Sequence, residues 1–209
     1  MIEVSEVSVV ADDVTLLAPV STSAQPGEAL IVRGRNGTGK STLLRVLAGS
    51  RTPSSGTVQI GDAAVSERDP RFRRRVAVMI GLPPMAPDLT LLDHVALVAA
   101  TWFDRREDST ARANEVLADL GLRTLHARFP HELSSGQTQL FGLALVLVRP
   151  FDVLILDEPE QRLDPEHIET VVRVLRSRRD GGATLVVATH SDVIADGLGD
   201  RMLTLEAAA

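Results

Sequence analysis

The sequence predicts an α/β fold with a mostly parallel sheet, and three observations indicate it. Continuous apolar runs at 153–156 and 184–188 are typical of strands that are buried on both faces of a parallel sheet. A helical pattern separates the two runs, and such alternation is characteristic of α/β folds. The segment 82–150 is mainly helical in pattern, so we expect a helical insertion between strand-rich parts at 1–81 and 151–209.

The first part of the chain is expected to supply several strands. Residues 2–20 are rich in valine and partly alternate in polarity, which predicts one or two strands. After a Pro-Gly turn, a short buried strand is expected at 28–32. A helix at 40–48 and a further strand at 57–60 follow, and the apolar residues 76–79 are expected to form one more strand.

Helix start signals place the later helices. Thr90 and Asp93 have the spacing of a capping box, which predicts a helix that continues to about residue 102. Asp164 is a suitable N-cap, with Pro165 at the first helical position. One more amphipathic helix is expected from apolar residues at helical spacing: Ala113, Val116, Leu117 and Leu120.

The composition excludes several functional classes. The chain has 209 residues, 44% apolar and 24% charged, which is typical of a globular domain. Its net charge of −6 argues against a nucleic-acid partner, and the lack of cysteine excludes disulfides and thiolate chemistry. The longest uncharged apolar run covers only 140–148, whereas a membrane span needs roughly 18–20 residues. Without a signal-peptide pattern, we expect a cytosolic chain that reaches a membrane only through partners.

A glycine-rich segment lies between the strand at 28–32 and the helix that follows it. It fits the pattern G-x-x-x-x-G-K-[ST], in which glycines let amide groups point at phosphate oxygens above a helix N-terminus. Lys40 would bring a positive charge to the β- and γ-phosphates, and the Ser41 hydroxyl would ligate Mg²⁺. The predicted nucleoside triphosphate site consists of Gly34, Arg35, Asn36, Gly37, Thr38, Gly39, Lys40, Ser41 and Thr42.

Two adjacent carboxylates, Asp157 and Glu158, follow the strand at 153–156. They would lie at the carboxyl edge of the sheet, where open α/β sheets bind ligands. Asp157 can hold Mg²⁺ through water, and Glu158 can deprotonate an attacking water. Two acids at a strand end can also simply be solvated, and the glycine-rich segment earlier in the chain favours the catalytic interpretation.

Two further segments give weaker signals on their own. Ser134, Ser135, Gly136 and Gln137 open a helix and could form a second phosphate cradle, although a plain polar loop is the simpler interpretation. His190 follows the strand at 184–188 and could contact a γ-phosphate. A lone histidine at a strand end is more often structural.

Together and in this order, these segments resemble the ATP-binding-cassette (ABC) ATPase family. Residues 34–42 match its Walker A motif, and 153–157 match Walker B. Residues 133–137 resemble the signature LSGGQ, with Ser135 in place of its first glycine. The matches to the catalytic glutamate, the D-loop and the switch histidine are Glu158, Asp164 and His190.

The resemblance covers essentially the whole chain and implies ATP hydrolysis, with ATP and Mg²⁺ bound. It implies one domain: a P-loop NTPase core at 1–81 and 151–209 that includes an N-terminal antiparallel β part, and a helical subdomain with the signature at 82–150. Family members dimerise head to tail, so Ser134 and Gly136 would contact the γ-phosphate held by the opposing chain. The implied partners are a second cassette, identical or not, and separate transmembrane chains at the inner face of the cell membrane.

Three features depart from the family pattern. The aromatic residue that stacks on adenine would lie near Val10 and Ala11, and the chain has no tyrosine, so we expect weaker base selectivity. No glutamine follows the strand at 76–79, where the family has a residue that ligates Mg²⁺ and links the site to the membrane partner. The helix at 140–148 is apolar throughout, which indicates a core helix or an additional partner surface.

The main prediction is the ATPase subunit of an ABC transporter. A soluble ABC ATPase that acts as an assembly switch stays open, as does a cassette that binds ATP with little hydrolysis. The basic run 71–75 is predicted to be a solvated face, with a phosphate-rich partner such as lipid headgroups as the alternative. Trp102 and Phe103 are predicted to be the buried end of a helix, with a partner groove as the alternative.

Overall fold

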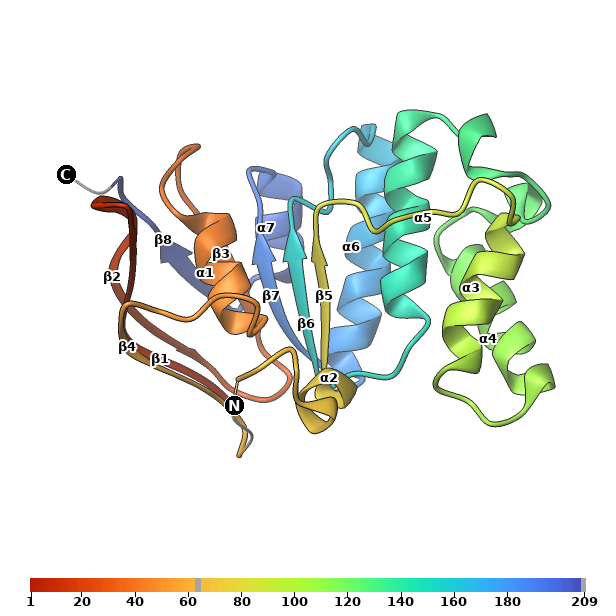
Figure 1. Ribbon diagram of the computed structural model, residues 1–209. Helices are drawn as coiled ribbons and strands as arrows, with labels where there is room; N and C mark the ends of the chain where they lie inside the picture. Colours follow the sequence, from red (N-terminus) through yellow and green to blue (C-terminus); the bar gives the residue numbers. More distant parts are fainter. Residues whose placement is uncertain (63–64, 208–209) are drawn as a thin grey trace.

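A five-stranded parallel sheet forms the centre of the protein (Figure 1). The computed structural model describes residues 1–62 and 65–207. All neighbouring strands of this sheet are parallel, in the order β5-β6-β7-β3-β8, which confirms the predicted α/β class. The strands are β3 (Ala29–Arg33), β5 (Val76–Ile80), β6 (Val153–Asp157), β7 (Thr184–Ala188) and β8 (Arg201–Thr204).

Alternate residues of the central strands enter two hydrophobic cores on opposite faces of the sheet. On one face, Leu154 and Leu156 of β6 belong to the same core as residues of α5 (Ser135–Leu147) and α6 (Pro165–Asp180). On the other face, Ile155 shares a core with α1 (Lys40–Leu47) and the antiparallel sheet. Both faces are therefore covered, which is why 153–156 is apolar without interruption.

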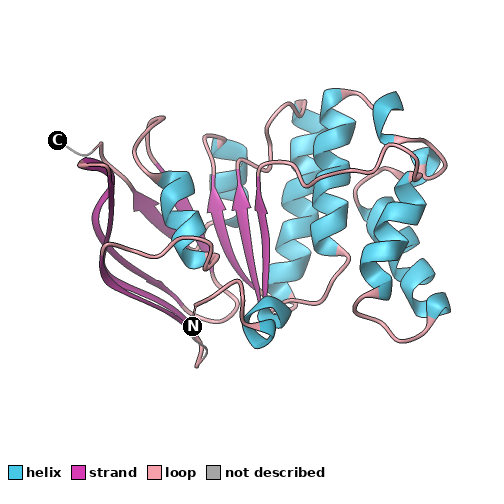
Figure 2. Cartoon of the chain, viewed as in Figure 1, coloured by secondary structure: helices cyan, strands magenta, loops and turns pink. Residues whose placement is uncertain are grey.

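The N-terminal strands form a separate antiparallel sheet in the order β2-β1-β4. They are the long curved strands at the left of Figure 2. The strands of this sheet are β1 (Ile2–Ala11), β2 (Val14–Ala24) and β4 (Ser55–Ile60). Asp12 and Asp13 connect the first two with φ of 49° and 61°, the left-handed pair that a tight hairpin turn requires. The prediction of strands within residues 2–20 is confirmed, and β2 extends four residues further, to Ala24.

The inserted helices are α3 (Leu91–Ala100), α4 (Arg106–Asp119) and α5, with short 3-10 turns at Arg123–Leu125 and Pro130–Glu132. The predicted capping box begins α3: the Thr90 hydroxyl accepts from the Asp93 amide at 3.2 Å, and the Asp93 carboxylate accepts from the Thr90 amide at 3.3 Å. The exact limits of a helical subdomain at 82–150 stay a prediction.

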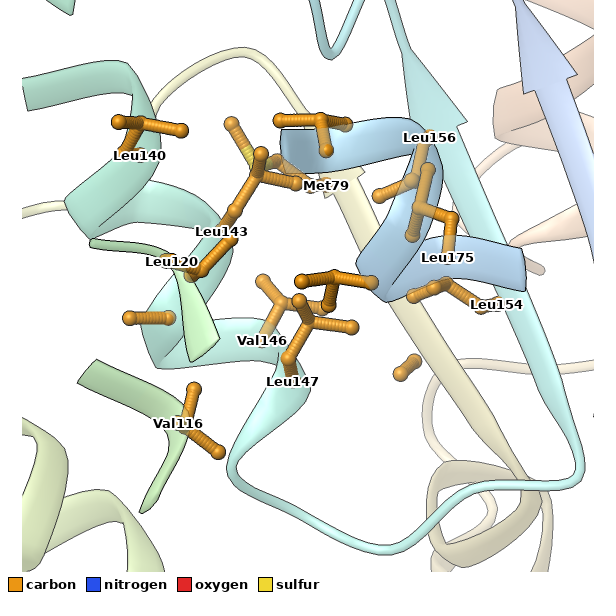
Figure 3. Close-up of a cluster of buried hydrophobic side chains, with 14 of the residues drawn as sticks. Met79, Val116, Leu120, Leu140, Leu143, Val146, Leu147, Leu154, Leu156 and Leu175 are labelled. Carbon is orange, nitrogen blue, oxygen red and sulfur yellow. The ribbon is translucent and has the colours of Figure 1, made fainter. Parts of the chain in front are cut away.

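The continuous apolar run of α5 is explained by burial on all sides. Residues 139–147 of α5 are buried, and so is Val148 directly after it. Figure 3 shows Leu143 of α5 beside Leu120, the C-cap of α4, and Val146 and Leu147 of α5 on the side of α6 and β6. The core interpretation of 140–148 is confirmed, and the alternative of an additional partner surface is wrong.

Three elements are not predicted by the sequence: α2 (Pro70–Arg75), α7 (Asp192–Leu198) and β8. Each is short, with seven residues or fewer; in α2 only Phe72 is buried, and in β8 Met202 is 58% exposed. Such elements are stabilised by the surface on which they pack. Residues 71, 73 and 74 are exposed, as expected for a solvated face.

The prediction for Trp102 and Phe103 is wrong. The helix α3 ends at Ala100, and both aromatic residues lie beyond it, half-buried. Thr101 is the C-cap of α3, and the chain then turns toward α4. Within residues 1–62 and 65–207, none of the helices has the length and apolarity that crossing a membrane requires.

Candidate active site

The glycine-rich loop connects β3 to α1 and requires glycine at several positions. Gly37 and Gly39 have φ of 83° and 93°, in the left-handed region that favours glycine. A Cβ atom on Gly39 would lie 2.6 Å from the Leu16 carbonyl oxygen, so β2 closes tightly on the loop. Nothing lies within 4 Å of the Cβ position of Gly37, which faces open space. The loop is thus fixed on one side and accessible on the other.

Lys40, the first residue of α1, bends back over this loop. Its side chain is 6% exposed, and its Nζ atom donates to the carbonyl oxygens of Gly34 at 2.9 Å and Arg35 at 3.2 Å. Thr38 stabilises the same turn, because its hydroxyl donates to the Arg35 carbonyl at 2.9 Å. The Lys40 Nζ atom also lies 3.0 Å from Nε2 of His190.

Strand order explains why His190 reaches the loop. The strand β7 lies between β3 and β6, so the chain after β7 emerges between the glycine-rich loop and the pair Asp157–Glu158. His190 Nε2 is 3.4 Å from Glu158 Oε1. The structure therefore brings together Lys40, Glu158 and His190 from the carboxyl ends of three neighbouring strands, at the sheet edge where α/β folds bind ligands.

Glu158 has an uncommon backbone conformation, which is stabilised by hydrogen bonds with two other residues. Its φ is 48°, a left-handed value that costs a non-glycine residue about 1–3 kcal/mol. Its amide donates to the Ala188 carbonyl at 2.8 Å. Its carbonyl accepts from Gln139 Nε2 at 3.2 Å, and that same amide group donates to the Pro159 carbonyl at 3.2 Å. The carboxylate of Glu158 is thereby directed toward the loop rather than away along the chain.

A cleft of about 550 Å³ lies above the loop. Its floor includes Lys40, Ser41 and Thr42 at the N-terminus of α1, with Glu158 at one side. Asn36, Gly37 and Gly39 also line it, and the wall formed by β2 consists of Val14, Thr15 and Leu16. This lining offers amide groups, one ammonium group and hydroxyls to an anionic ligand, and an aliphatic wall beside them.

Ser41 and Asp157 are the residues that could hold Mg²⁺. Their hydroxyl and carboxylate oxygens are ligands that Mg²⁺ prefers, and this ion usually takes its remaining ligands from phosphate and water. Asp157 ends β6 opposite Ala188 of β7. In the described part of the chain, no group of three or more His, Asp or Glu side chains could hold a metal ion by itself. The donor set fits a Mg²⁺ ion that arrives with a nucleotide.

The other predicted residues do not line this cleft. Ser134 is the N-cap of α5: its hydroxyl accepts from the Gln137 amide at 3.2 Å, and the Gln137 side chain accepts from the Ser134 amide at 3.0 Å. Ser134 and Ser135 are exposed at this helix end, and Gly136 faces the chain near Arg162, where a Cβ would lie 3.0 Å from the Arg162 carbonyl oxygen.

Asp164 likewise lies outside the cleft, at the N-terminus of α6. Its carboxylate accepts from the His167 amide at 2.9 Å and pairs with the His167 ring at 2.7 Å. These two hydrogen bonds lower the pKa of Asp164 below its ordinary value. The contribution of Asp164 within one chain is to cap α6.

Sequence reasoning misses two positioning residues, Gln139 and Glu160. Gln139 is 4% exposed and holds the turn after Glu158, as described above. One carboxylate oxygen of Glu160 accepts from the Thr189 hydroxyl, from the His190 amide at 3.1 Å and from the Ser191 amide at 3.3 Å. Two signals in the sequence could have identified them: Gln139 is an amide directly before an apolar run, and Glu160 is a third acid, directly after a proline.

Comparison with known proteins decides the family. The sequence profile of the ABC transporter family matches residues 17–161, which is more than half of the chain. The chain belongs to the ABC transporter family. The matched range begins in β2, contains the glycine-rich loop and the signature segment, and ends just after Glu158.

Relatives and solved structures of ABC cassettes agree with this assignment. The cytochrome c biogenesis ATP-binding export protein CcmA of Xanthomonas oryzae is 36% identical, covering 93% of this chain and 88% of the relative. The cell division ATP-binding protein FtsE of Bacillus subtilis is 31% identical, covering 99% and 92%. A dimeric ATP-binding cassette in a post-hydrolysis state with ADP and phosphate has a TM-score of 0.88 and 25% identity, covering 99% and 94%.

This ABC protein is an ATPase, the ATP-binding and ATP-hydrolysing subunit of an ABC transporter. Two of the departures from the family pattern can also be located in the structure. No aromatic side chain lines the described cleft, whose β2 wall carries Val14 and Leu16. After β5, residues 81–84 stand where the family has its glutamine, and they line a different groove.

Proposed function

We propose that Lys40, Glu158 and His190 act together on the γ-phosphate of ATP. The observation that carries this proposal is their mutual contact, with Nζ of Lys40 3.0 Å and Oε1 of Glu158 3.4 Å from the same His190 nitrogen. A γ-phosphate bound by Lys40 would therefore also be within reach of His190 and of the carboxylate that must meet the attacking water.

Each residue has a role that its chemistry allows. The loop amides from Gly34 to Thr42, including those of Arg35, Asn36, Thr38 and Gly39, bind the phosphate chain, and Lys40 neutralises charge on its β- and γ-oxygens. Glu158 accepts the proton of the attacking water, and His190 stabilises the charge that develops on the γ-phosphoryl group. Ser41 and Asp157 hold Mg²⁺, which when bound supplies further charge neutralisation at these oxygens.

A second cassette completes the site in this proposal. Ser134, Ser135, Gly136 and Gln137 lie at the exposed N-terminus of the 13-residue helix α5, outside the chain's own cleft. The positive end of that helix, together with a serine hydroxyl, suits the γ-phosphate of ATP bound to an opposing chain. Asp164 would lie at the same contact, as the resemblance implies. Hydrolysis then depends on closure of the dimer.

A groove on the surface of the protein supports the proposal of a transmembrane partner. It has a volume of about 490 Å³ and lies between the end of α1, β5 and the connection to α3, with Ile80, Leu82 and Pro83 in its wall. Its mixed apolar and basic lining suits a short helix from a transmembrane chain. Such attachment would place this protein at the inner face of the cell membrane. The residues that replace the family glutamine, 81–84, are then in direct contact with the partner.

The experiment that tests the site uses Glu158→Gln and Lys40→Ala. With Mg-ATP, E158Q is expected to lose turnover and to elute as an ATP-bound dimer in size-exclusion chromatography, because the binding charges remain while the base is absent. K40A is expected to lose ATP binding in equilibrium dialysis. Parental turnover by E158Q, or tight ATP binding by K40A, contradicts the assigned roles.

A further inference from the structure

A group of arginines without carboxylate partners lies on and beside α2. We call it the basic patch and define it by Arg68, Arg71, Arg73, Arg74 and Arg149. The first four are exposed, and in the part of the chain that the structure describes none of the five forms an ion pair. Their neighbour Arg75 differs, because it is held between Asp62 at 2.6 Å and Asp152 at 2.8 Å.

The local structure leaves these charges available. Arg73 donates to the backbone carbonyls of Glu67 at 3.0 Å and Arg68 at 3.1 Å, so its positive charge is not cancelled. The nearby carboxylate of Asp69 accepts from the Arg71 amide at 2.8 Å as the N-cap of α2. Arg71 and Arg74 lie three residues apart in this helix and so share one side of it. Positive charge is therefore concentrated here in a chain of net charge −6.

The fifth arginine joins the patch to the only tryptophan of the chain. The Arg149 guanidinium carbon lies 4.2 Å from the ring centroid of Trp102, and its buried Nε has no hydrogen-bond partner in the structure as described. Burial and the positive charge of Arg73 lower the pKa of Arg149. A cleft of about 840 Å³ beside α2 is lined by Arg73, Arg74, Trp102 and Phe103, with Asp104 as its one acid.

The patch is continuous with the groove to which the transmembrane partner is proposed to bind. Phe72, Arg73 and Arg149 line that groove, and Arg73 also lines the cleft beside Trp102. In the proposed assembly the basic patch therefore lies next to the membrane-embedded chain, where the surface of the bilayer is within reach of a contact. Arginine binds lipid phosphates through several N–H groups, and tryptophan is enriched at the level of the headgroups.

We propose that the basic patch binds the headgroups of anionic phospholipids beside the transmembrane partner. Exposed guanidinium groups on the open side of α2, with an amphipathic indole nearby, suit a plane of many phosphates better than a single acidic segment. The inference takes the position of the membrane from the proposed function, but it does not depend on nucleotide binding.

The test uses the purified chain and two kinds of vesicle, phosphatidylcholine alone and phosphatidylcholine with phosphatidylglycerol in equal parts. The chain is expected to sediment only with the anionic vesicles, and less so as salt is raised. Tryptophan emission is expected to shift to shorter wavelength on binding. Because the chain has one tryptophan and no tyrosine, this emission reports Trp102 alone.

Charge reversal separates this patch from non-specific attraction. Arg71→Glu with Arg74→Glu is expected to weaken vesicle binding at least about tenfold, given the contribution of each basic residue at an anionic surface. Arg71→Lys with Arg74→Lys keeps the charge and should keep binding. The matched control, Arg123→Glu with Arg201→Glu, changes the net charge equally at exposed positions elsewhere and should also keep binding.

Equal sedimentation with both kinds of vesicle, or equal loss in the two reversal variants, overturns the inference. It is also overturned if R71E/R74E keeps vesicle binding but no longer co-purifies with a transmembrane chain, since an acidic protein segment would then be the occupant. ATP binding, measured on the same samples, separates the two proposals. A chain that binds ATP but no vesicle refutes the lipid inference alone, whereas one that fails to bind ATP refutes the proposed function.

Discussion

Gln139 is expected to stabilise the fold and to position Glu158, and its replacement by leucine tests both effects. Leucine has a similar volume, so the substitution removes two hydrogen bonds without opening a large cavity. The Glu158 carbonyl would keep one partner, the Gln161 amide at 3.0 Å, whereas Gln139 is the only described donor to the Pro159 carbonyl. One buried carbonyl would therefore be left unpaired.

The magnitude follows from these two losses. An unpaired buried carbonyl costs about 1–3 kcal/mol, and the second lost hydrogen bond contributes about 1 kcal/mol. Gln139→Leu should therefore lower the free energy of unfolding by roughly 2–4 kcal/mol. Urea unfolding measures this through the midpoint, provided that the slope is unchanged. A matched control is Gln59→Ala, which removes a bond of the same kind to the Gly61 carbonyl, 2.9 Å long but exposed; its cost should stay within about 0.5 kcal/mol.

The catalytic readout is separate from stability. Without Gln139, the left-handed turn at Glu158 loses one of the bonds that hold it, so the carboxylate is less well placed for the attacking water. Below the unfolding transition, kcat for ATP should fall while the dissociation constant for ATP is unchanged, because the glycine-rich loop is intact. A Q139L protein with parental stability and parental kcat would refute the reasoning.

Three further predictions concern the glycine-rich loop, the recognition of the nucleotide base and the N-cap of α6. Gly39→Ala should abolish ATP binding in equilibrium dialysis, because the added Cβ meets the Leu16 carbonyl at 2.6 Å in a left-handed backbone; normal affinity would contradict this. ATP and GTP should bind with similar affinity in a competition assay, since Val14 and its neighbours offer no aromatic face to the base; strong preference for ATP would refute this. The folded-state pKa of Asp164 is lowered by His167, so the stability it contributes is complete above its ordinary value of 3.8 and is lost as the pH falls below it. Asp164→Asn keeps the cap, and its free energy of unfolding should fall less steeply than that of the parent as the pH is lowered. The same dependence of unfolding free energy on acid pH in both proteins would contradict this.

Much of the fold follows from local patterns in the sequence. The central strands are recognisable because burial on both faces demands uninterrupted apolar residues, as in β6 and β7. The capping residues Thr90, Ser134 and Asp164 start helices as their side chains predict. Short elements such as α2 and α7 are different, because six or seven residues carry too little periodicity to be distinguished from loops.

The limits of the sequence are clearest for the aromatic residues and for the buried polar groups. Trp102 is predicted at the buried end of a helix, but α3 ends two residues earlier, and Arg149 from beyond α5 packs on the indole. Gln139 and Glu160 give no local signal of their partners, which are 19 to 31 residues away in the chain. Such contacts depend on the path of the whole chain.

The sequence by itself determined the chemistry of this protein: a glycine-rich loop with Lys40, and a carboxylate pair after a buried strand. These are local properties, because backbone freedom, charge and apolar runs are set by neighbouring residues. Only the tertiary structure decided the order of the strands, which places β7 between β3 and β6 and so brings His190 to Lys40 and Glu158. Apolar patterns specify that a strand is buried but not which strands are its neighbours, and that pairing depends on the fold as a whole.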